Sequence, residues 1–135
     1  MIQIYALSVF ANILTGLLVA SDPGEGRGFF GQLRKLAEDN GLKLFLGIAA
    51  LVIALFKLLS PIEGDIPVVG DLLPAIGGLA TGAILLFDSL RGSSRLRNET
   101  VVRLESGLNA YRNYVGLGAA AVGVLHFVVP TVPVL

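Results

Sequence analysis

Three ionisable side chains lie in or beside apolar stretches, and they are the residues most able to do chemistry. Lys57 lies near the end of one apolar run, Asp71 at the start of another and His126 inside the last one. An ionisable group within hydrocarbon is costly, so its default interpretation is functional. Histidine also changes charge near neutral pH. We therefore predict an ion or proton site at Asp71, Lys57 and His126, in which Asp71 pairs with Lys57 and His126 titrates.

Each of the three residues also has a purely structural interpretation. The long stem of Lys57 can carry its ammonium to the membrane interface. Asp71 can cap the helix that follows it, because the helix dipole favours an anion there. A neutral His126 imidazole can be hydrogen-bonded to another helix. The ion or proton site therefore requires that the three side chains converge near the non-cytoplasmic face, together with Glu63 and Asp65.

The sequence lacks the residues and motifs that enzymes, metal sites and nucleotide-binding sites require. The chain has no Cys and a single His, and it contains no nucleophile elbow, no H-E-x-x-H motif and no phosphate-binding glycine loop. With ten basic and ten acidic residues, its net charge of zero gives no general attraction to nucleic acid. We expect no enzyme, no catalytic residue, no cofactor, no metal site and no nucleic-acid partner.

The elements that must position these residues are long apolar helices. The chain has 135 residues, of which 54% are hydrophobic and 15% charged, and its mean hydropathy is +0.79. A helix needs roughly 20 apolar residues to cross a hydrocarbon core of about 30 Å. Four runs have about this length: 1–20, 42–59, 71–90 and 114–134. They predict an all-α integral membrane protein whose four transmembrane helices form one domain, 1–135.

The positions of the basic residues predict the orientation. Every Lys and Arg except Lys57 lies between the first and second runs, between the third and fourth, or, for Lys43, at the start of the second run. Short cytoplasmic loops accumulate such residues, so both termini are expected on the non-cytoplasmic side of a bacterial inner membrane. A secretory signal would carry a basic residue before its apolar run. In this chain the first Lys or Arg is Arg27, which comes after the first run. We expect the first run to be a retained helix.

The two basic segments have helical patterns of their own. In segment 28–40, apolar residues recur at helical spacing among charged ones, and Gly41 is expected to end the helix. The apolar face of this helix should lie on the bilayer interface or on a partner helix. In segment 98–113, Asn98 is a good N-cap and Glu99 suits the first turn. We expect that helix to continue into the fourth run, although either segment can also be a solvated connector.

The two halves of the chain resemble each other. Residues 13–22 (ILTGLLVASD) align with residues 79–88 (LATGAILLFD), and residues 46–50 (LGIAA) align with residues 117–121 (LGAAA). This pattern predicts two tandem two-helix repeats related by a pseudo-two-fold axis along the membrane normal. Chance recurrence of small apolar residues is the alternative.

Small residues predict where the helices touch. Lipid tails give no hydrophobic drive for helix association, so close backbone approach must supply the contact. Gly78 and Gly82 form a GxxxG motif, and Gly118 and Gly123 lie in the glycine-rich fourth run. We expect all four to be helix-packing residues, either between copies of the chain or between the third and fourth spans. We also expect the polar residues Asn12 and Thr15 of the first run to form hydrogen bonds between helices.

Two classes of small bacterial membrane protein do not fit. Small multidrug exporters have a similar length and four helices, but they need a carboxylate in the middle of the first helix, where this chain has Asn12 and Thr15. Half-transporter sugar carriers use a Pro-Gln pair, which is absent. Residues 60–71 resemble the Pro-Ile-Asp, Ile-Pro and Gly-x-x-Asp signature of a small uncharacterised bacterial membrane family, but their spacing differs and identifies no family.

These observations leave two functional hypotheses. The first is a structural or accessory subunit, with the lipid bilayer and either like copies or another membrane protein as its partners. The alternative is a small oligomeric transporter or channel with a proton- or cation-responsive site near the non-cytoplasmic face. Few polar residues lie within the apolar runs, which favours the first hypothesis.

Overall fold

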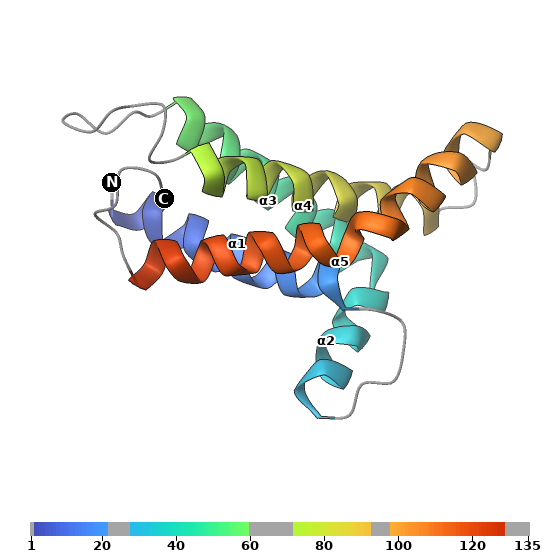
Figure 1. The fold of residues 1–135 in the computed structure, drawn as a ribbon, viewed down its shortest axis with the longest axis horizontal. Coiled ribbons are helices and arrows are strands. Elements are labelled where there is room, and N and C mark those ends of the chain that lie inside the picture. Colours follow the sequence, from blue (N-terminus) through green and yellow to red (C-terminus); the bar gives the residue numbers. More distant parts are fainter. Residues whose placement is uncertain (1, 22–27, 60–71, 93–97, 129–135) are drawn as a thin grey trace.

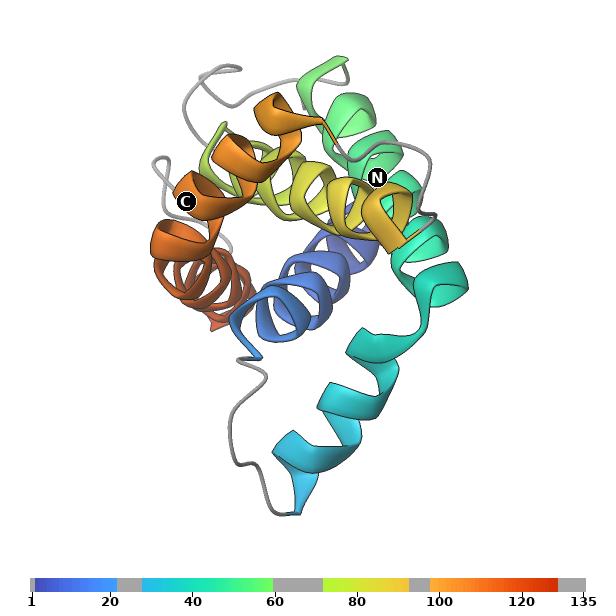
Figure 2. The same cartoon turned by 90° about the vertical axis from the view of Figure 1, so that its right-hand side faces the viewer.

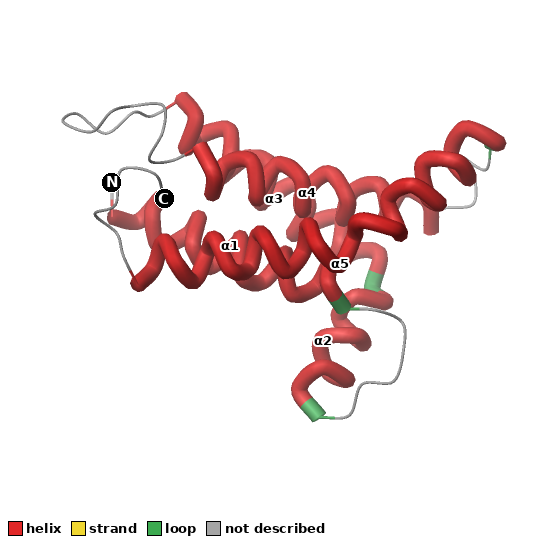
Figure 3. Tube along the Cα trace, in the orientation of Figure 1, coloured by secondary structure: helices red, strands yellow, loops and turns green. Residues whose placement is uncertain are grey.

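Five α-helices make up the described part of the chain. The computed structural model describes residues 2–21, 28–59, 72–92 and 98–128. The helices are α1 (Ile2–Ala20), α2 (Phe29–Glu38), α3 (Asn40–Leu59), α4 (Leu72–Gly92) and α5 (Glu99–Val128). No strand occurs in these residues (Figure 3). The prediction of an all-helical chain is confirmed for this part of it.

The four long helices form a bundle, and α2 branches away from one end (Figure 1). Helix α1 packs mainly against α5, and α3 packs mainly against α4. Helices α1 and α4 also contact each other, whereas the backbones of α3 and α5 do not approach each other closely among the described residues. Seen along the bundle, α1 and α4 therefore lie centrally, with α5 and α3 flanking them (Figure 2).

In the described part of the chain, three helices are long and apolar enough to span a membrane by length and composition: Gln3–Ala20, Asn40–Leu59 and Leu72–Arg91. The expected fourth span, 114–134, covers the second half of α5 and then continues into residues outside the described part. The first half of α5 is the expected segment 98–113, and the helix runs through both without a break.

The junction between α2 and α3 differs from the expectation that Gly41 ends the first of them. Helix α2 ends at Glu38 and Asp39 is extended, with φ −77° and ψ 110°. The Asp39 carboxylate then accepts hydrogen bonds from the backbone N–H groups of Gly41 and Leu42, at 2.8 Å and 3.2 Å. Asp39 thus satisfies two of the unpaired donors at the start of α3. Gly41 lies inside the first turn of α3 because this cap begins the new helix before it.

Helix α2 uses part of its apolar face to pack on the bundle. Leu33 is buried in a cluster with Leu18 and Val19 of α1 and Ile84 and Leu85 of α4. Phe29 and Leu36 stay exposed. Since Leu33 contacts other helices, at least this part of the predicted amphipathic face lies on a helix partner.

The predicted packing glycines divide into three that contact a neighbouring helix and one that does not. A Cβ at Gly78 would lie 3.2 Å from Ala54 Cβ, and one at Gly82 would lie 3.0 Å from Gly47 O, both in α3. A Cβ at Gly123 would lie 2.8 Å from the Ile13 side chain in α1. The GxxxG motif of α4 therefore faces α3 rather than the expected fourth span.

Gly118 is the exception, because a Cβ there would meet nothing within 4 Å. Gly116 instead makes the closest approach of α5 to α1, and a Cβ at Gly116 would lie 2.6 Å from Gly16 O. Two residues along a helix of 3.6 residues per turn lie on nearly opposite faces. Within this chain, Gly118 is therefore not a packing residue, because Gly116 and Gly123 set the face that meets α1.

Candidate functional site

Lys57 and His126 meet at the end of the bundle where α3 and α5 end. Each lies in the last turn of its helix. Lys57 is 5% exposed and His126 is 4% exposed. Lys57 Nζ lies 2.8 Å from His126 Nε2, within hydrogen-bonding distance. The structure thus brings together two of the three residues of the predicted site, and Lys57 does not extend to the surface there.

Tyr5 of α1 completes this cluster. Its hydroxyl donates a hydrogen bond to the backbone carbonyl of His126. Its ring lies 4.7 Å from the imidazole, centroid to centroid, and Lys57 Nζ lies 5.8 Å from the centre of the Tyr5 ring. A cation at that distance is attracted by the negative face of the ring. Three helices therefore hold the Lys57 and His126 side chains in place.

The contact between the two nitrogens defines what the cluster can do chemically. A Lys57 ammonium can donate to Nε2 of a neutral imidazole, or a protonated imidazole can donate to a neutral Lys57 amine. In either form, one proton lies between two basic nitrogens. The arrangement can therefore hold a proton within the bundle and transfer it between α3 and α5.

Asp71, the third predicted site residue, lies outside the described residues, as do Glu63 and Asp65. Its expected pairing with Lys57 therefore stays a prediction. Among the described residues, no group of three or more His, Asp or Glu side chains is placed to hold a metal ion.

A second set of polar side chains lies deeper in the bundle, between α1 and α4. Asn12 Nδ2 donates to the backbone carbonyls of Ser8 and Pro74, each at 3.0 Å. Thr15 Oγ1 and Thr81 Oγ1 lie 2.9 Å apart and share a hydrogen bond. The prediction that Asn12 and Thr15 form hydrogen bonds between helices is confirmed. These bonds join the two central helices to each other.

Sequence reasoning missed the polar group at the opposite end of the bundle. The Arg112 guanidinium of α5 forms a bidentate ion pair with Asp88 of α4. Its Nε donates to the carbonyl of Val19 at 3.0 Å, which is one of the four carbonyls left unpaired at the end of α1. Arg112 thus ties three helices together. The signal in the sequence was Asp88, which is the one charged residue of the apolar run 71–90 besides Asp71 at its start.

Comparison with known protein families assigns this chain to one of them. A family model matches residues 1–126. The chain belongs to this family. The family is uncharacterised, so membership assigns no activity to the Lys57 and His126 cluster. No curated protein and no solved structure matches the chain.

Proposed function

We propose that this chain is an integral membrane protein with four spans. The observation that supports embedding is the distribution of side chains, which is the reverse of that in a soluble bundle. Phe10, Phe45 and Phe127 are at least two-thirds exposed on the outside, while Lys57 and His126 are buried inside. This distribution suits a protein surrounded by lipid, because every polar group in the bilayer core must find its partner within the protein.

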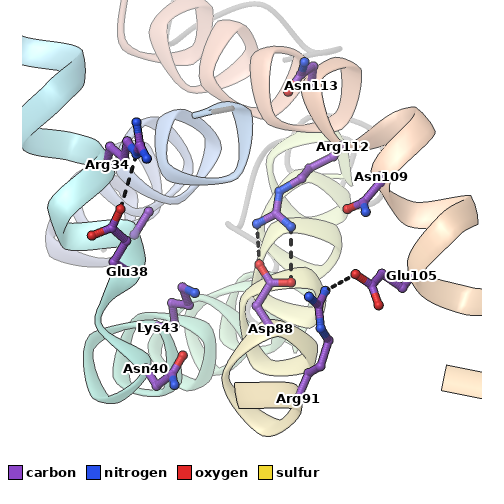
Figure 4. Close-up of a pocket in the computed structure, with 11 residues that line it drawn as sticks. Arg34, Glu38, Asn40, Lys43, Asp88, Arg91, Glu105, Asn109, Arg112 and Asn113 are labelled. Atoms are coloured by element: carbon purple, nitrogen blue, oxygen red, sulfur yellow. Dashed lines mark hydrogen bonds and ion pairs between the residues drawn. The ribbon is translucent and has the colours of Figure 1, made fainter. Parts of the chain in front are cut away.

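The fourth span in this proposal is the apolar half of α5 with the residues that follow it, 114–134. The charges support one orientation of all four spans. Arg91 and Arg112 lie at the end of the bundle where α1 and α4 end (Figure 4), and α2, with its own cations, branches from the same end. That end faces the cytoplasm, because cytoplasmic loops of membrane proteins are rich in Lys and Arg. Both termini then lie on the non-cytoplasmic side of a bacterial inner membrane.

The chain is further proposed to consist of two tandem repeats, with α1 equivalent to α4 and α3 equivalent to α5. Thr15 and Thr81 are 66 residues apart and hydrogen-bond to each other between the two central helices. The next residue after each is a glycine, and each glycine packs on a glycine of its flanking helix: Gly16 on Gly116, and Gly82 on Gly47. In this proposed symmetry the counterpart of Gly47 is Gly116. The sequence alignment of residues 46–50 with residues 117–121 instead pairs Gly47 with Gly118.

The role that the geometry favours is that of a structural or accessory subunit, one that self-associates or joins a larger membrane complex. The observation that carries this is the close approach of the helices. An added Cβ at Gly16 or Gly116 would lie 2.5–2.7 Å from the backbone of the facing helix. Backbones this close leave no room for a solute between α1 and α5. Helix α2 and the first turns of α5 extend beyond the bundle and offer surface to a partner (Figure 1).

Two measurements test this proposal. Reporters fused at Gly26 and Ser93 should be active in the cytoplasm, and the purified protein should need detergent and elute as an oligomer or with a partner. A periplasmic reporter signal, or a monodisperse protein in plain buffer, would contradict the membrane topology. A strict monomer in detergent, extracted from the membrane without a partner, would contradict the subunit role alone.

The second candidate is a small oligomeric transporter or channel with a proton- or cation-responsive site. The buried contact between Lys57 and His126 favours it, because a proton held between two helices can be coupled to their movement. Proton leak into proteoliposomes is the direct assay. A leak that is lost in the Asp71→Asn and His126→Phe variants would support this function over the subunit role, and the absence of a leak would exclude it.

A further inference from the structure

A charged cavity lies at the end of the bundle opposite Lys57 and His126. Its volume is about 650 Å³, and residues from α2, α3, α4 and α5 line it (Figure 4). Each of these helices contributes one cation: Arg34, Lys43, Arg91 and Arg112. The cavity also has three carboxylates, so its described lining carries one more positive than negative charge.

Three ion pairs hold the arginines at the wall of the cavity. Arg112 pairs with Asp88, and Arg91 pairs with Glu105. On α2, Arg34 Nε donates to Glu38 at 3.2 Å. A guanidinium has five N–H donors, and the bonds that the described residues form to Arg34 and Arg91 use only some of them. Arg34 and Arg91 therefore keep N–H donors that a ligand can use.

Lys43 is the cation that the described residues do not pair. Its side chain is half-buried, lines the cavity and makes no ion pair with any carboxylate in the described part of the chain. Asn40 of α3 and Asn109 of α5 also line the cavity, and their side-chain amides can supply neutral donors. A positive charge with neighbouring N–H donors suits a phosphate oxygen.

The position of the cavity along the apolar spans indicates which molecule would supply such a phosphate. Asn40 begins one of the apolar spans and Arg91 ends another, and both residues line the cavity. If the spans lie in a bilayer, the cavity is level with the lipid headgroups. Basic pockets between helices on the cytoplasmic side of membranes are known to bind anionic headgroups.

We propose that this cavity binds the phosphate group of an anionic lipid, with Lys43 as the main cation. The inference rests on the proposed embedding of the chain in a membrane. Detergent extraction from the membrane fraction tests that embedding by itself. A chain that is embedded but shows no lipid preference would therefore overturn only the lipid site.

Native mass spectrometry of the full chain in an uncharged detergent tests the site. Phosphatidylglycerol or phosphatidylcholine is added at equal concentration, and the lipid-bound fraction is measured. The wild-type protein should retain phosphatidylglycerol in preference. Lys43→Gln should weaken that binding about fivefold, as expected for one cation near an anionic headgroup. Lys43→Arg should restore most of it.

Lys35→Gln is the matched control, because Lys35 is an exposed cation that does not line the cavity. It should leave the binding of phosphatidylglycerol unchanged. Equal losses in the Lys35→Gln and Lys43→Gln variants, or equal retention of the two lipids by the wild-type protein, would overturn the proposal. Millimolar inorganic phosphate tests the other source of the same group. Displacement of the lipid by free phosphate at this concentration would assign the cavity to a soluble anion and overturn the lipid site.

Discussion

Among single residues, the two threonines between the central helices, Thr15 and Thr81, each lie within hydrogen-bonding distance of two oxygen atoms. Thr15 Oγ1 lies 2.7 Å from Ala11 O, and Thr81 Oγ1 lies 2.9 Å from Gly77 O. Each hydroxyl has only one proton to donate. One threonine therefore donates to the other, while the second donates to the carbonyl one turn earlier in its own helix. This bond links the two central helices without leaving either hydroxyl unpaired.

A double-mutant cycle on this pair tests whether the bond contributes to stability. Thr15→Val and Thr81→Val keep the side-chain shape and remove the hydroxyls, so each should lower the free energy of unfolding modestly. The coupling energy should be about 0.6 kcal/mol, the average for hydrogen bonds between membrane helices. Unfolding of the two single variants and the double variant in detergent gives this value. Strictly additive losses would show that the two hydroxyls do not interact.

At this scale the sequence predicted the types of polar residue better than their partners. Asn12 and Thr15 were expected to bond to another helix because an unpaired polar group in hydrocarbon is costly, and both do. The ion pair between Arg112 and Asp88 was not expected. Spacing along a helix shows which residues share a face, but it does not show which face of another helix lies opposite.

On the scale of helices, apolar length predicted the long helices well, because the thickness of a bilayer sets that length. The junctions and contacts were predicted less well. Helix α3 starts before Gly41 because Asp39 caps it, and a local cap outweighs the helix-ending tendency of a glycine. The GxxxG motif of α4 meets α3, since a stripe of small residues indicates a close contact without identifying the partner helix.

Two glycines in the same helix provide a test of which face of α5 is packed. Gly116→Ala would place a methyl group 2.5 Å from Ala20 N and 2.6 Å from Gly16 O, both backbone atoms that cannot rotate away. We expect a loss of about 1–3 kcal/mol in the free energy of unfolding, as in other overpacked cores. Thermal unfolding in detergent measures it.

Gly118→Ala is the matched control, because the added methyl group meets nothing within 4 Å. Alanine also favours a helix over glycine by about 1 kcal/mol. The Gly118→Ala variant should therefore be as stable as the wild-type protein or slightly more stable. A loss at Gly118 equal to that at Gly116 would mean that the face carrying Gly118 is packed against another copy of the chain.

Across the whole molecule, the proposed two-fold relation gives the Lys57 and His126 cluster a simple origin. The two residues are 69 residues apart. His126 follows Gly116 at the same distance along the chain as Lys57 follows Gly47, so the proposed repeat makes their positions equivalent. Equivalent residues that touch must lie beside the axis that relates them. The threonine pair, between the central helices, meets the same condition.

Exchanging the two residues tests this equivalence in the full chain. The double variant Lys57→His with His126→Lys restores a contact between a lysine and a histidine, and we expect its unfolding free energy to lie within about 1 kcal/mol of the wild-type value. His126→Lys alone places two amines in one buried site, which should cost on the order of 3 kcal/mol. Thermal unfolding in detergent compares the three proteins. If the double variant is as unstable as His126→Lys, the two positions are not interchangeable, and the proposed duplication loses its main residue-level support.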